Sequence, residues 1–187
     1  MDGHLLERET ELAVIEDLIG AAAVGGRLLA IEGPPGIGKT SLVAEAKSRG
    51  QEAGMQVLGA RGSELERPFS YGVVRQLFEP FLAGLPDEER AELLAGAAAL
   101  ATPVLDPAQL TAEPARAEAS LATLHGFYWL TANVAARRPL LLAVDDLHWC
   151  DCPRCASWLT SCLGWRGSTC WSSSASGRGN REKTRAS

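Results

Sequence analysis

One segment decides the fold of this chain: Gly33-Pro34-Pro35-Gly36-Ile37-Gly38-Lys39-Thr40. It matches the pattern G-x-x-x-x-G-K-[ST] at every fixed position, which chance seldom produces in a chain of 187 residues. Glycines let the backbone turn its amide groups inward, and the start of a following helix adds partial positive charge. Both features favour the binding of phosphate oxygens. The segment therefore predicts a phosphate-binding loop rather than an ordinary turn rich in glycine and proline.

Each residue type in this loop has an expected part in nucleotide chemistry. The Lys39 ammonium should reach the β- and γ-phosphates and act as a catalytic group, and the Thr40 hydroxyl should be a ligand of Mg²⁺. Only three lysines occur in the chain, and one of them stands at this position. The residues expected to bind ATP are Gly33, Pro34, Pro35, Gly36, Ile37, Gly38, Lys39, Thr40 and Ser41.

The segments around the loop alternate between strand and helix patterns. Buried strands are expected at residues 27–32 and 140–146, with a weaker strand at residues 55–60. Helices are expected at residues 9–22, 39–53, 69–82, 87–100 and 115–136, with a proline-containing connector at 103–114. The alternation predicts an α/β fold in which helices cover both faces of a parallel sheet.

Two acids close the strand expected at residues 140–146. In P-loop folds an acid at this position holds Mg²⁺ through water, and Asp145 is the candidate for that role. Asp146 is the candidate catalytic residue that orients or deprotonates the attacking water. Paired Asp residues at a strand end are also common as helix caps or solvated ends. The upstream loop makes the functional interpretation the stronger one.

Several stretches closely resemble one protein family. They are Glu7 to Leu12, Arg67 to Phe78, Leu124 to Leu130, and the run Leu-Leu-Leu-Ala-Val-Asp-Asp-Leu-His-Trp-Cys-Asp from Leu140 to Asp151. They resemble the ATP-binding domain of large LuxR-type transcriptional regulators, an AAA/STAND-type P-loop ATPase. The resemblance implies an ATP-dependent switch, with Walker A and Walker B motifs at the loop and at Asp145. It also implies a DNA-binding domain far downstream, which nothing in this sequence matches. For His148 and Trp149 we favour packing over a role in the site.

The composition changes near residue 150. Residues 1–150 contain 12 Lys and Arg against 21 Asp and Glu, whereas residues 151–187 contain 6 against 2. All five cysteines lie between Cys150 and Cys170, and residues 151–187 contain no Ile, Val, Met or Phe. The cysteine spacing is a poor match to a zinc site. We expect a partial ATP-binding domain at residues 1–151 and a disordered tail at residues 152–187.

Our hypothesis for this change of composition is a frameshift near residues 151–155. GC-rich codons written for residues 165–178 and read in another frame can encode a buried-strand pattern. We therefore expect an incomplete parallel sheet after the Walker B strand. The resemblance implies that the next strand would lie between the two motif-bearing strands, and the tail offers no replacement for it. Weak or absent hydrolysis and a marginal fold are the expected consequences.

Charge and hydropathy exclude several other functions. The net charge of -5 argues against a general nucleic-acid-binding surface, so we expect no direct contact with nucleic acid. The polar start is unlike a secretory signal, and no apolar run approaches a membrane span. We expect a cytoplasmic location, ATP with Mg²⁺ as cofactors, and oligomerisation only in the intact regulator.

Three alternatives stay open beside the switch domain. A stand-alone P-loop kinase would need an acceptor site and a lid, which residues 85–136 do not offer. A module that binds ATP without hydrolysing it would retain ATP and release no phosphate. A non-functional remnant of a frameshifted gene would be followed by homologous reading frames downstream.

Overall fold

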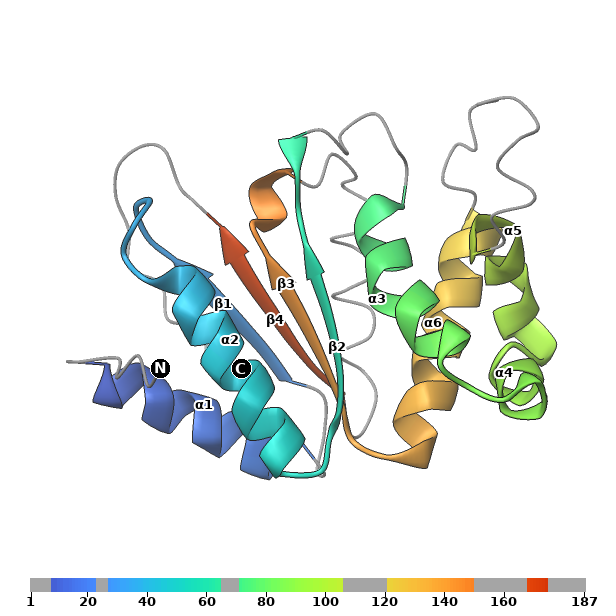
Figure 1. Cartoon of the computed structure of the whole chain (residues 1–187), viewed down its shortest axis with the longest axis horizontal. Coiled ribbons are helices and arrows are strands. Elements are labelled where there is room, and N and C mark those ends of the chain that lie inside the picture. The colour runs from blue at the N-terminus through green and yellow to red at the C-terminus, as the bar shows by residue number, and fades with distance from the viewer. Residues whose placement is uncertain (1–7, 23–26, 65–70, 106–120, 150–167, 175–187) are drawn as a thin grey trace.

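The computed structural model describes residues 8–22, 27–64, 71–105, 121–149 and 168–174. A four-stranded parallel sheet forms the middle of the fold, in the strand order β1-β4-β3-β2. Its strands are β1 (Arg27–Glu32), β2 (Gln56–Arg61), β3 (Leu140–Asp145) and β4 (Ser168–Ser174). The sheet therefore places the strand before the phosphate-binding loop and the strand that ends in Asp145 on either side of β4 (Figure 1).

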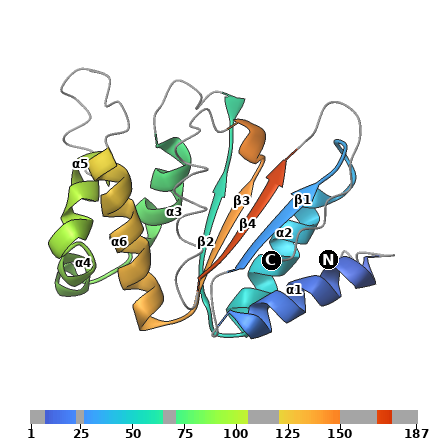
Figure 2. The ribbon, with the colours of Figure 1, turned by 180° about the vertical axis from the view of Figure 1, so that it is seen from behind.

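Helices cover both faces of the sheet. The main helices are α1 (Glu9–Ala21), α2 (Lys39–Glu52), α3 (Gly72–Ala83) and α6 (Leu121–Arg137). Shorter elements are α4 (Asp87–Leu93), α5 (Thr102–Leu105) and the 3₁₀ turns η2 (Gly96–Ala101) and η4 (Leu147–Trp149). Helices α1 and α2 lie on one face, and α3 and α6 lie on the other (Figures 1 and 2).

Strand β3 supplies side chains to the core on both faces. Leu140, Leu142 and Val144 pack in the cluster that contains residues of α3 and α6. Leu141 and Ala143 pack in the cluster formed with α1 and α2. Every residue of β3 is buried, as expected for a parallel strand covered on both sides. Because β3 is packed on both faces, the acids at its end are held in a fixed position.

The expected elements are confirmed around the loop, and their boundaries differ by more than one residue in three places. Helix α3 begins at Gly72 and not at residue 69, because Tyr71 has φ 69°, which a helix does not allow. The helix expected at 87–100 ends at Leu93, because the backbone of Ala95 is extended, with ψ 158°, before η2 begins at Gly96. Part of the expected connector at 103–114 is helical, since α5 spans Thr102–Leu105.

The expectation that no strand replaces the one after Walker B is wrong. Strand β4 lies between β1 and β3 and pairs with both in parallel, with Thr169 opposite both Arg27 and Leu141. The pairing of parallel strands uses backbone amides and carbonyls, so a segment poor in aliphatic residues can still complete the ladder. Residues 152–167 and 175–187 lie outside the described residues, and for them disorder stays a prediction.

The fold class is the expected one, an incomplete α/β P-loop NTPase fold with a short parallel sheet. Within the described part of the chain, none of the helices has the length and apolar character of a membrane-spanning segment.

Candidate nucleotide site

The loop from Gly33 to Thr40 connects the end of β1 to the start of α2. Gly36 and Gly38 have φ of 81° and 92°, values that side chains with a Cβ rarely adopt. The first bond of the α2 ladder runs from the Leu42 amide to the Gly38 carbonyl, at 3.1 Å. The amides of residues 39–41 precede that ladder and point out of the helix N-terminus. The sequence thus builds the amide-lined, partly positive cradle that phosphate requires.

Lys39 lies inside this loop. Its side chain is buried, and its Nζ donates hydrogen bonds of 3.0 Å to the carbonyls of both Gly33 and Pro34. These two bonds hold the Lys39 ammonium against the backbone of the loop, near the amides that are expected to bind phosphate. Neutral carbonyls carry no compensating negative charge, so the ammonium can still attract an anion.

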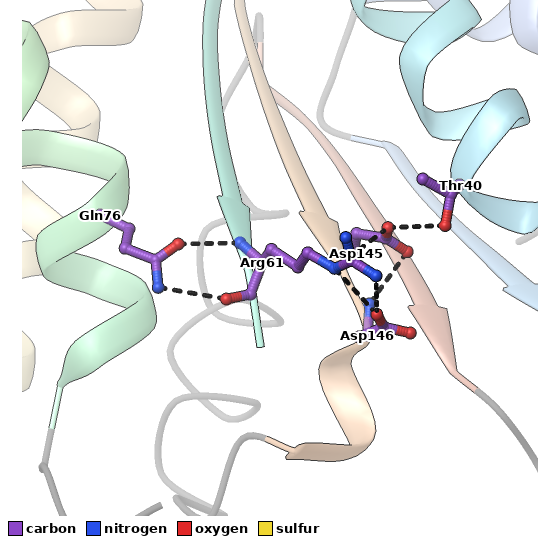
Figure 3. Close-up of polar contacts among 5 residues, drawn as sticks. All are labelled: Thr40, Arg61, Gln76, Asp145 and Asp146. Atoms are coloured by element: carbon purple, nitrogen blue, oxygen red, sulfur yellow. Dashed lines mark hydrogen bonds and ion pairs between the residues drawn. The ribbon is translucent and has the colours of Figure 1, made fainter. Parts of the chain in front are cut away.

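Thr40 and Asp145 bring the two motifs together. The Thr40 hydroxyl donates a hydrogen bond of 2.8 Å to Oδ2 of Asp145, across 105 positions of sequence (Figure 3). Asp145 is only 6% exposed, because β3 is covered on both faces. A hydroxyl and a carboxylate at this separation are the donors that Mg²⁺ uses beside nucleotide phosphates.

The donor set fits Mg²⁺ bound with a nucleotide better than a metal held by protein alone. Among the described residues, no group of three or more His, Cys, Asp or Glu is placed to hold a metal ion. Mg²⁺ sites typically combine one or two carboxylates with phosphates and water. The site thus has the residues for a metal that arrives with ATP.

Asp146 follows Asp145 in a left-handed backbone conformation, with φ 52°. Its amide donates a 3.0 Å hydrogen bond to Oδ1 of Asp145, the carboxylate oxygen that does not accept the Thr40 bond. A residue other than glycine in this conformation costs about 1–3 kcal/mol and is often found at functional sites. The strained turn directs the Asp146 carboxylate to the end of the sheet, beside Asp145 (Figure 3).

Arg61 and Gln76 belong to the same network and were missed by the sequence reasoning. Arg61 ends β2, and its Nε and Nη2 each lie 3.0 Å from Oδ2 of Asp146. Gln76 on α3 accepts a bond from the Arg61 amide and donates one to its carbonyl, at 2.9 and 3.1 Å. The sequence signal that could have identified Arg61 is an arginine at the end of an expected strand. The ends of parallel strands meet at one edge of the sheet, and the two acids lie at the same edge.

A second missed residue supports the loop from the N-terminal side. Arg8 donates a 2.6 Å hydrogen bond to the Ile37 carbonyl and another of 2.6 Å to Oε1 of Glu11. The hydrogen bond from Arg8 lowers the pKa of the Glu11 carboxyl. Glu11 is therefore ionised at neutral pH and keeps the guanidinium oriented toward the loop. No pattern in the sequence joins Arg8 to a carbonyl 29 residues away.

The structure brings the predicted residues to one edge of the sheet. Thr40 approaches it from α2, and Asp145 and Asp146 approach it from the end of β3 (Figure 3). Lys39 precedes Thr40 as the first residue of α2. The other loop residues predicted to bind ATP lie beside them: Gly33, Pro34, Pro35, Gly36, Ile37, Gly38 and Ser41. Their contact with nucleotide stays a prediction. Trp149 is half-buried and its amide donates to the Asp146 carbonyl at 3.0 Å.

Gly62 offers a structural test of this edge. Its amide donates a 2.8 Å hydrogen bond to the Asp145 carbonyl, and a Cβ at this position would lie 2.3 Å from the Asp146 carbonyl oxygen. We expect Gly62→Ala to lower the free energy of unfolding by about 1–3 kcal/mol, because the backbone of Asp146 must move. Denaturant unfolding measures this change.

The matched control is Gly20→Ala in α1, where no atom lies within 4 Å of the new Cβ. It should leave stability unchanged or raise it by up to about 1 kcal/mol, since alanine favours helix over glycine. Equal effects of the two substitutions would show that the close approach at Gly62 does not constrain the acids.

Comparison with known proteins identifies a family. The family model described as an AAA ATPase domain matches residues 4–153, which include the loop, Arg61, Gln76 and both acids. No curated protein matches the chain.

Proposed function

The chain belongs to the AAA ATPase domain family, and from this premise we propose that it binds Mg²⁺-ATP at the loop of residues 33–41 and hydrolyses it slowly. One observation supports the proposal above the others. The 2.8 Å bond between Thr40 and Asp145 joins the phosphate-binding loop to the acid of β3. Each motif alone occurs in other contexts, but their contact is what a nucleotide-bound metal requires.

The chain's own residues would divide the work of binding. The amides of residues 39–41 point out of α2 toward the phosphates, and Lys39 exchanges its carbonyl partners for phosphate oxygens. Thr40 and Asp145 would hold Mg²⁺, Thr40 directly and Asp145 through water. When bound, the metal would neutralise charge on the β- and γ-phosphates.

Asp146 would position the water that attacks the γ-phosphorus. Its carboxylate accepts the water proton as the new P–O bond forms and the bond to ADP breaks, giving ADP and phosphate. The strained backbone at Asp146 supports this role, since strain of this kind is kept where a side chain must be aimed.

The role of the domain is that of a nucleotide switch in a LuxR-type transcriptional regulator. The support is the family-like runs around Arg67–Phe78 and Asp145–Trp149, together with the family match. ATP and ADP would favour different states of the domain, and so different states of a larger cytoplasmic protein. Contacts with DNA would then belong to other parts of that protein.

The proposed boundary of the ATP-binding domain lies at residue 151. The family match ends at residue 153, and the change in composition at residue 150 supports an out-of-frame origin for residues 152–187. In that case, β4 forms from residues that are not the native continuation. The DNA sequence across codons 145–187 tests this: a second frame that lacks an apolar strand would disprove the frameshift.

Binding is tested by comparing ATP with AMP on the whole chain. With Mg²⁺ present, ATP at one hundred times its dissociation constant should stabilise the folded protein by about 2.7 kcal/mol, measured as a rise in unfolding temperature. AMP lacks the β- and γ-phosphates that the loop recognises, so it should have little effect. Phosphate release then separates hydrolysis from binding alone. A folded protein that responds equally to both nucleotides would contradict the proposal.

A further inference from the structure

Arg61 places a cation beside both acids of the proposed metal site. Its Nε lies 3.9 Å from Oδ2 of Asp145, and its Nη2 lies 3.0 Å from Oδ2 of Asp146. The Asp145 oxygen is the same atom that accepts the Thr40 hydrogen bond (Figure 3). The guanidinium thus hydrogen bonds to Asp146 and lies 3.9 Å from the Asp145 oxygen that is proposed to hold Mg²⁺ through water.

The backbone holds Arg61 in this position while its side chain is largely exposed. In the register of the sheet Arg61 is directly opposite Asp145, and Gln76 binds both its amide and its carbonyl. The Arg61 side chain is 67% exposed, whereas that of Asp145 is 8% exposed. An exposed arginine pairs weakly and can leave its partner, whereas the buried acid stays in place.

The negative charges at this edge of the sheet favour a cation such as the Arg61 guanidinium. Asp145 and Asp146 are adjacent carboxylates, and a triphosphate at the loop would bring further negative charge to them. A cation is needed in that arrangement. Mg²⁺ supplies it with the nucleotide, and a guanidinium supplies it when the metal is absent.

We propose that Arg61 occupies the acid pair as a substitute cation and yields it to Mg²⁺, and thereby sets how strongly ATP binding depends on the metal. The inference rests on the proposed function, because it concerns the same site. Arg61 is a positioning residue in this scheme. It favours binding of metal-free ATP by neutralising both acids, and it opposes metal binding by competing for Oδ2 of Asp145.

The test is the ratio of the ATP dissociation constant in EDTA to that in excess Mg²⁺, measured by calorimetry on the whole chain. For Arg61→Gln we expect this ratio to rise about threefold to fivefold, the range of a partly exposed ion pair. Without the guanidinium the two carboxylates repel metal-free ATP more strongly, and Mg²⁺ no longer competes with Arg61. Arg61→Lys retains the charge and should keep the ratio within about twofold of the wild type.

Two further variants make the result specific. Arg90→Gln removes another arginine from an exposed ion pair, with Asp87 at 2.6 Å on α4, and should leave the ratio unchanged. Gln76→Ala releases the backbone of Arg61 and should raise the ratio in the same direction as Arg61→Gln, by a smaller factor. Unfolding curves establish that each variant is folded.

The outcomes separate this inference from the proposed function. An unchanged or lowered ratio in Arg61→Gln, with ATP still bound, overturns the role of Arg61 and leaves the nucleotide site intact. An equal rise in Arg90→Gln also overturns it, because the effect would then be one of overall charge. A folded wild-type chain that binds no ATP in either condition overturns both.

Discussion

Lys39→Ala is expected to weaken the binding of Mg²⁺-ATP by about 30-fold or more. Removing one partner of a buried charge pair costs about 2–5 kcal/mol, and each 1.4 kcal/mol is tenfold in affinity. Lys39 is the one lysine of the loop, and its Nζ bonds to Gly33 and Pro34 place it under the phosphate cradle. Calorimetric titration with ATP and Mg²⁺ measures the change.

Lys47 provides the matched control in the same helix. Its Nζ lies over β2, 2.9 Å from where a Cβ on Gly59 would be, and Lys47 is half-buried there. Lys47→Ala should keep ATP affinity within about twofold of the wild type, because Lys47 follows the loop by two turns of helix and is directed at β2. If both alanine variants bind ATP as the wild type does, Lys39 is not a phosphate ligand and the loop does not hold the triphosphate.

Asp146→Asn is expected to lower the rate of ATP hydrolysis by about 10²–10⁴-fold while ATP stays bound. The amide has the size of the carboxylate but accepts no proton from water, and a general base contributes that much to the rate. Asparagine also tolerates the left-handed conformation, so φ 52° at this position is not a reason for misfolding. Single-turnover phosphate release at saturating Mg²⁺-ATP isolates the chemical step.

Asp87→Asn is the control for this change. Asp87 also pairs with an arginine, Arg90 at 2.6 Å, but lies on α4 away from the sheet edge. Its replacement should leave both binding and hydrolysis unchanged. Unaltered hydrolysis in Asp146→Asn would assign the base to another residue.

The sequence predicted the elements that a local pattern determines. The loop pattern, the apolar run of β3 and the glycines at 36 and 38 each act within a few residues, so β1, α2 and β3 lie where expected. Helix boundaries set by the backbone of single residues, at Tyr71 and Ala95, were not predicted. A residue in a left-handed conformation is not marked by its side chain unless it is glycine or asparagine.

Long-range contacts were the harder part of the prediction. Nothing local indicates that Arg61 pairs with Asp146 or that Arg8 reaches the Ile37 carbonyl, because these contacts join elements far apart in the sequence. Strand β4 was missed for a different reason. The amino-acid composition of a segment indicates whether its side chains can fill a core. Strand β4 is instead positioned by backbone pairing with both of its neighbours.

Hydrogen–deuterium exchange can show whether the backbone amides of the loop hold the phosphates of ATP. On addition of Mg²⁺-ATP to the whole chain, we expect slower exchange in peptides covering residues 33–41 and no comparable change in α4. Exchange that stays unchanged across residues 33–41, in a folded protein saturated with ATP, would place the nucleotide elsewhere and exclude this loop as its binding site.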